Sequence, residues 1–144
     1  MKKFFIVLFS IALLTSCSED DDANNGERIY GKWFVSNANL PSGESFTFEL
    51  SNCNKKSFII FEGDGTTYSE YYAETGETCE LEDDTESTWS RDNDNYTFNI
   101  PVGGINERIS GKVEFQENAK SFIFRPSIFP DASITFTRAP EFEE

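Results

Sequence analysis

The 144-residue sequence contains no histidine, three cysteines, and only 12 lysines and arginines against 26 aspartates and glutamates. The absence of histidine excludes Ser–His and Cys–His catalytic pairs and every histidine-ligated metal centre. The formal net charge of −14 argues against nucleic-acid binding, because contacts to phosphate groups need lysine and arginine. An acidic protein of this kind stays soluble and is repelled by anionic surfaces.

The chain opens with Lys2 and Lys3, followed by an apolar run over residues 4–14. This run is short for a membrane-spanning helix, which needs about 20 residues, and has the length of a signal-peptide core. It ends in the sequence LTSC (14–17), which resembles the lipobox of bacterial lipoproteins. The resemblance implies cleavage before Cys17 and lipid on its sulfur, so that this residue anchors the protein to a membrane. The alternative is an ordinary secretory signal in which the cysteine is coincidental.

Residues 17–26 are polar and strongly acidic, which predicts a solvated, flexible tether. The run SEDDD (18–22) also resembles the acidic export signal of some lipoproteins of diderm bacteria. That resemblance implies an outer-membrane lipoprotein that is exposed at the cell surface. We therefore expect a signal peptide over 1–16, a tether over 17–26, one domain over 27–139 and an acidic tail over 140–144.

If Cys17 carries lipid, Cys53 and Cys79 remain in an oxidising compartment, where two thiols most simply form a disulfide. The closed loop would contribute about 3 kcal/mol to the stability of a small domain. A metal or redox pair is the alternative, but the chain offers no histidine and no C-x-x-C spacing.

Strand-like segments separated by turn signals fill the rest of the sequence and predict one all-β domain. Short turns at 63–65, 92–95 and 116–119 favour an antiparallel meander, which eight strands close most economically as an up-and-down barrel. The acidic stretch 77–86 is interpreted as a solvated loop rather than a calcium site, because it lacks the Asp-x-Asp-x-Asp-Gly pattern. The predicted strands are 29–36, 56–62, 66–73, 86–92, 95–100, 105–115, 120–126 and 133–138.

The motif Gly31-Lys32-Trp33 resembles the Gly-x-Trp signature of lipocalins, and the order of later motifs resembles the lipocalin-like domains of bacterial surface lipoproteins. These later motifs are the segment 50–72, then Cys79, then STWS (87–90). The resemblance implies a lipocalin-like barrel closed at one end by Arg138 stacked on Trp33, worth about 1 kcal/mol. Ser87 departs from the family pattern. Pro126 and Pro130 also depart from it, and they predict an irregular edge in the last connection.

Large aromatic residues on the predicted strands either fill the barrel or line a ligand cavity, since a barrel of eight strands holds little more than its own side chains. We expect a non-enzymatic, lipid-anchored binding protein with no cofactor, by resemblance a binder of a small apolar molecule. The alternative is a protein-interaction module with a filled barrel, either an inhibitor or an accessory subunit of an outer-membrane assembly. Segment 37–52 is expected either to cover the barrel mouth or to form part of a contact face. The candidate ligand-lining residues are Phe61, Tyr68, Tyr72, Trp89, Phe98, Phe124 and Phe136.

Overall fold

A computed structural model describes residues 28–39, 50–103, 105 and 107–139. The described residues form strands, two short 3-10 helices and a helical segment at residues 28–29, and every pair of hydrogen-bonded strands is antiparallel. The predicted all-β class is therefore confirmed. Among the described residues, no helix is long or apolar enough to cross a membrane. The elements are β1 Gly31–Asn39, η1 Asn54–Lys56, β2 Phe58–Phe61, β3 Thr66–Thr75, β4 Thr78–Thr88, β5 Ser90–Asp92, β6 Asn95–Asn99, β7 Arg108–Gln116, η2 Glu117–Ala119, β8 Ser121–Pro126 and β9 Ser133–Thr137.

Several predicted features lie outside the described residues. These are the signal peptide over 1–16, the lipidation site Cys17, the tether over 17–26 and the tail over 140–144. Most of the predicted mouth segment 37–52 also lies outside them, since residues 40–49 are not described.

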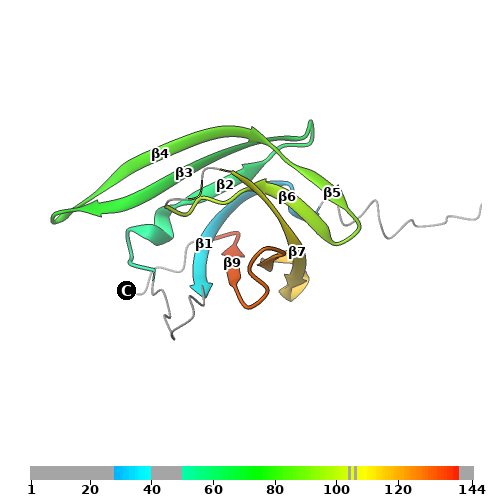
Figure 1. The fold of residues 1–144 in the computed structure, drawn as a ribbon. Helices are drawn as coiled ribbons and strands as arrows, with labels where there is room; N and C mark the ends of the chain where they lie inside the picture. Colours follow the sequence, from blue (N-terminus) through cyan, green and yellow to red (C-terminus); the bar gives the residue numbers. More distant parts are fainter. Residues whose placement is uncertain (1–27, 40–49, 104, 106, 140–144) are drawn as a thin grey trace, which may run out of the picture.

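The strands form one nine-stranded sheet in the order β4-β3-β2-β1-β9-β8-β7-β6-β5, which curls on itself (Figure 1). Its two edge strands, β4 and β5, are consecutive in the chain and separated only by Trp89. The chain therefore pairs with β3 before this residue and with β6 after it. The expected barrel of eight strands is thus a curled sheet of nine, because one predicted strand is divided where it changes partner.

The seam between β4 and β6 is closed by side chains, since no ladder pairs these two strands among the described residues. The Ser87 hydroxyl donates a hydrogen bond to Asn99 Oδ1 at 2.8 Å. Arg108 Nη1 reaches from β7 and donates to the Thr88 hydroxyl at 2.7 Å. These two contacts hold together the two rims of the sheet.

The predicted acidic loop is in fact the first part of β4, and this prediction was wrong. β3 and β4 form a long hairpin that turns at Gly76, whose φ of 66° favours glycine. The distal half of the hairpin projects beyond the other strands (Figure 1), and β4 is exposed along most of its length. Alternation of apolar and polar residues marks a strand only when one face is buried. Because the distal half of this hairpin is solvated on both faces, the sequence of β4 there lacks that signal.

The three predicted turns are present. Asp64 accepts hydrogen bonds from the main-chain N–H and the hydroxyl of Thr66 at 3.0 and 2.6 Å, which fixes the β2–β3 turn. Asn93 takes a φ of 56° between β5 and β6, a conformation that asparagine tolerates well. Residues 117–119 all have positive φ between β7 and β8.

The two prolines leave the pairing of the last strands intact. Pro126 ends β8 opposite Gly111, and β8 still pairs with β9 from Ser121↔Thr137 to Phe124↔Ile134. Pro130 lies in the exposed connection that follows. Gly111 is required where it stands, because a Cβ atom there would lie 2.3 Å from the carbonyl oxygen of Arg125.

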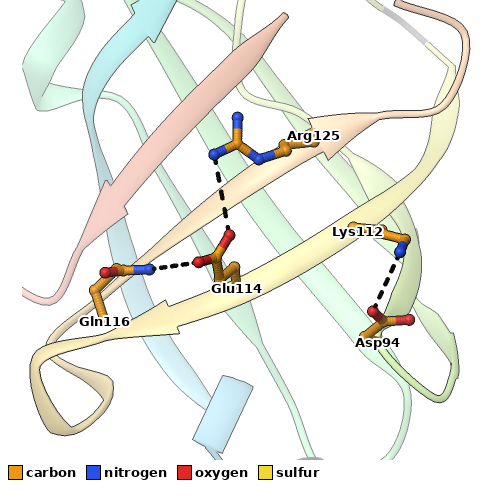
Figure 2. A network of polar contacts seen from close by, with 5 residues as sticks. All are labelled: Asp94, Lys112, Glu114, Gln116 and Arg125. Carbon is orange, nitrogen blue, oxygen red and sulfur yellow. Dashed lines mark hydrogen bonds and ion pairs between the residues drawn. The ribbon is translucent and has the colours of Figure 1, made fainter. Parts of the chain in front are cut away.

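The outer face of β7 and β8, with the turn before β6, carries a sparse polar network (Figure 2). Lys112 Nζ lies 3.7 Å from an Asp94 carboxylate oxygen, and Arg125 Nη2 lies 4.0 Å from one of Glu114. The side chains of both pairs are about half exposed or more. Ion pairs of this kind contribute at most about 1 kcal/mol each, so the fold depends on its interior instead.

Candidate functional site

Four of the seven predicted ligand-lining residues lie in a packed core instead of a cavity. Phe61, Phe98, Phe124 and Phe136 are each 0–1% exposed. The ring centroid of Phe98 lies 5.0, 4.7 and 6.2 Å from those of the other three. Such edge-to-face and tilted contacts are the favoured packing of aromatic rings. Among the described residues, the middle of the barrel is therefore packed by these rings.

Tyr68 and Tyr72 lie on the outer face of β3, so their predicted place inside the barrel was wrong. Both hydroxyls donate hydrogen bonds to the Glu70 carboxylate, at 2.7 and 2.5 Å. Ser69 and Tyr71, which alternate with these three residues, point to the opposite face because successive residues of a strand alternate. Glu70 raises the pKa of Tyr68 to about 12, since its bond to the hydroxyl favours the protonated phenol.

Trp89 closes the barrel end at which β2 turns into β3. Its indole N–H donates to the carbonyl oxygen of Glu62 at 3.0 Å. Its ring lies 5.8 Å from that of Phe61 and is stacked 6.1 Å from that of Tyr96. This half-buried residue belongs to the plug of the closed end rather than to a ligand cavity.

Arg138 and Trp33 form the predicted pair at the same closed end. The guanidinium carbon of Arg138 lies 4.0 Å from the Trp33 ring centroid. The indole N–H of Trp33 donates to the Ile29 carbonyl at 2.7 Å. Gly31 has a φ of 104°, and a Cβ there would lie 3.0 Å from Arg138 Nη1. The glycine of the Gly-x-Trp motif is thus needed for two reasons, which are its positive φ and the close approach of Arg138.

Arg138 also ties three separate segments of main chain together. Its Nη2 and Nη1 atoms donate to the carbonyl oxygens of Arg28 and Tyr30 at 2.6 and 2.7 Å. Its Nε atom donates to that of Ala119 at 3.2 Å. Partial burial lowers the pKa of Arg138 from its usual high value. The residue is a clamp for the closed end, with a larger role than stacking alone.

Cys53 and Cys79 are joined in a disulfide with a Cα–Cα distance of 5.4 Å. It connects the chain just before η1 to the start of β4. The Asn54 amide adds a second tie, because its Nδ2 atom donates to the Tyr72 carbonyl at 3.0 Å. Both contacts hold the projecting hairpin to the rest of the domain.

The opposite end of the barrel, which we call the mouth, holds a cleft of about 360 Å³ between the β3–β4 hairpin and the end of β6. Its volume falls in the lower range of small-molecule sites. Polar side chains come from β3 and β4, and apolar ones from the segment after β6. The lining residues are Ser69, Tyr71, Glu82, Asp83, Thr85, Asn99, Ile100, Pro101, Val102, Gly103 and Ile105.

Two polar side chains in this cleft are more than nine-tenths buried and retain free hydrogen-bonding capacity. Ser69 and Asn99 are each 6% exposed. Among the described residues, the Ser69 hydroxyl has no hydrogen-bond partner, and Asn99 uses its Oδ1 atom for Ser87 while Nδ2 has none. Yet no fully buried side-chain nitrogen or oxygen of the described residues lacks a partner. The free atoms therefore open into the cleft, where a bound molecule or water can satisfy them.

Tyr71 forms one wall of the cleft. Its ring packs so closely on Gly103 that a Cβ at that glycine would lie 2.8 Å from the ring. Burial, and next the nearby Glu82 carboxylate, raise the pKa of the Tyr71 phenol. Its hydroxyl therefore remains protonated and able to donate at neutral pH.

The cleft residues were missed in the sequence because the predicted ligand set contained only large aromatics. The segment TTYSEYY (66–72) does contain the necessary signal, since Thr67, Ser69 and Tyr71 share one face of the strand. The acidic residues of β4 form no metal centre: among the described residues, no group of three or more Cys, Asp or Glu could hold a metal ion.

A family model described as lipocalin-like domain matches residues 29–124, which is more than half of the chain. A second model, described as prokaryotic membrane lipoprotein lipid attachment site, matches residues 1–18 and includes Cys17. No curated protein matches the chain. The protein belongs to the lipocalin-like domain family and is a membrane-anchored bacterial lipoprotein.

Proposed function

We propose that this lipoprotein is a non-enzymatic binding protein that holds a small molecule in the cleft at the barrel mouth. The observation that carries the proposal is the pair of buried, incompletely hydrogen-bonded side chains Ser69 and Asn99 in that cleft. Their free atoms open into the cleft, so a ligand that enters it can replace water as the hydrogen-bond partner of both side chains. The ligand sits at the mouth because the aromatic core fills the interior.

The proposal also includes a location in the cell. Lipid on Cys17 anchors the protein, and the acidic run after it supports export to the outer membrane and display at the cell surface. Proteinase treatment of intact cells, followed by detection of the domain, tests this part. Loss of the domain from intact cells is expected, and protection until the outer membrane is opened would contradict surface display.

Native mass spectrometry of the protein purified from its own host tests the binding function. We expect a stoichiometric small molecule on the wild-type protein and its loss from a Thr85→Trp variant, because Thr85 lines the cleft. Glu86→Trp is the matched control, since residue 86 faces outward opposite Tyr68 and should retain the molecule. A wild-type protein that is always empty, or equal occupancy of the two variants, would contradict the proposal.

A second candidate function, protein binding, is favoured by a different observation. Ile128 and Phe129, in the connection between β8 and β9, are 64% and 53% exposed. Adjacent exposed apolar residues of this kind often mark a contact with another protein. Photo-crosslinking from position 129 in intact cells distinguishes the two functions. A discrete crosslinked protein together with an empty cleft would favour the interaction module.

A further inference from the structure

The hairpin that forms one side of the mouth cleft contains a β-bulge that changes the direction of its acidic side chains. Tyr71 pairs with Asp83, but Tyr72 pairs with Leu81, so Glu82 is an extra residue in β4. In a regular strand, Glu82 and Asp83 would point to opposite faces. A bulge re-aims side chains locally, and here both acidic residues line the cleft.

The cleft lining is therefore negative and contains no balancing base. Among the described residues that line it, Glu82 and Asp83 are the charged ones, and none is lysine or arginine. Arg108 lines a neighbouring depression and donates its hydrogen bond to Thr88. The Glu82 carboxylate also acts on the phenol of Tyr71, which places negative charge beside the wall of the cleft.

The remainder of the lining divides into a polar floor and an apolar wall. The floor offers the hydroxyl of Ser69 and the Nδ2 donor of Asn99, both neutral groups suited to hydroxyl or carbonyl oxygens. Ile100 and Val102 form the buried part of the wall, 3% and 8% exposed. A fatty acid or another anion would meet two carboxylates here, and an alkane chain would leave the floor unsatisfied.

We propose that the mouth cleft selects small hydroxylated molecules that carry a positively charged amino group, of the size and polarity of an amino sugar. This inference rests on the proposed function. The ammonium group lies against Glu82 and Asp83, the hydroxyl groups bond to Ser69 and Asn99, and a carbon face packs on the apolar wall. The ligand class differs from the small apolar molecule that the family resemblance implies.

Three probes of nearly the same shape test the assignment: glucosamine, glucose and glucuronate, which are cationic, neutral and anionic at pH 7. Binding is measured by NMR titration of the isotope-labelled domain, with shift changes expected at the amides of Ser69 and Asn99. Glucosamine is expected to bind more tightly than glucose, and glucuronate more weakly. At low ionic strength, each carboxylate should raise the ratio of glucosamine to glucose affinity by about two- to fivefold. Added salt should lower this ratio.

Charge-neutralising variants show which carboxylates cause the preference for glucosamine over glucose. Glu82→Gln and Asp83→Asn should each lower the ratio of glucosamine to glucose affinity by about two- to fivefold. Asp84→Asn is the matched control, because it removes the same charge one residue away on the outer face, opposite Glu70. A ratio that is unchanged in both cleft variants, or reduced equally in the control, would overturn the inference.

The test separates failure of the ligand class from failure of the proposed function. Equal binding of the three sugars overturns the ligand class but leaves the cleft as a site. The same holds if none of the sugars binds and the protein from the host retains a molecule that has no amino group. No probe binding combined with an empty protein from the host overturns both.

Discussion

Replacement of Arg138 by alanine should open the closed end of the barrel. The change removes three hydrogen bonds to the carbonyl oxygens of Arg28, Tyr30 and Ala119. It also removes the cation–π contact with Trp33 at 4.0 Å. No other residue of the described chain holds these three carbonyls through its side chain, so their partners are lost together.

The expected loss of stability follows from those contacts. A hydrogen bond with a charged donor contributes about 1.5–3 kcal/mol, and a cation–π contact at an exposed site about 0.5–1 kcal/mol. The guanidinium is exposed to solvent on one side, and water can replace part of each bond, so the sum must be discounted. We expect a loss of about 2–3 kcal/mol, equivalent to a melting temperature lower by about 10 °C for a domain of this size.

Thermal and urea unfolding followed by circular dichroism measure the effect. Arg125→Ala is the matched control, because it removes the same side chain from an exposed ion pair with Glu114 at 4.0 Å and should cost less than about 1 kcal/mol. Arg138→Lys keeps the charge but cannot span three carbonyls, and its stability should be intermediate. Equal melting of the Arg138→Ala and Arg125→Ala variants would refute the clamp and leave Arg138 as a solvated strand end.

Other predictions concern the disulfide, a glycine and the outer tyrosine cluster. Serine at both Cys53 and Cys79 should cost about 3.5 kcal/mol by the chain-entropy relation for a separation of 26 residues, measured by urea unfolding; unchanged stability would show that the hairpin needs no covalent tie. Gly111→Ala should destabilise by more than about 2 kcal/mol, because its Cβ would clash with main chain of β8, and a fully stable variant would contradict this packing. Two tyrosine hydroxyls lower the pKa of Glu70, so the stability that they provide is present above its unfolded pKa and is lost as pH falls through the lowered value. Glu70→Gln should abolish this acid-side loss in pH-dependent unfolding. In an absorbance titration Tyr68 should ionise at about pH 12, and ionisation near 10 would contradict its bond to the carboxylate.

The sequence predicts the barrel and its closed end well, because both depend on local signals and one short motif. Turn residues such as Asp64 and Asn93 carry their own backbone preference, so turns can be recognised without knowledge of the fold. Strands with one buried face show alternation. The hairpin tip around Gly76 lacks it, since both faces of that region meet water, and the strand was therefore interpreted as a loop.

The mouth cleft could not be predicted to the same degree, because its residues are defined by which face of β3 is inside. Large aromatics usually indicate the inner face, but Tyr68 and Tyr72 satisfy their hydroxyls with Glu70 on the outside. The inner face near the mouth carries the smaller Ser69, which leaves space for the cleft. The bulge that turns Glu82 inward depends on the pairing of two strands and has no signature in β4 alone.

The side-chain seam between β4 and β6 shares a residue with the mouth cleft. Asn99 contributes one atom to that seam, through Ser87, and another to the floor of the cleft. The same amide group therefore takes part in the closure of the barrel wall and lines the cleft. On the proposed function, a molecule that bonds to Asn99 Nδ2 would also hold the amide in the orientation that accepts from Ser87, and binding would then stabilise the closure of the barrel wall.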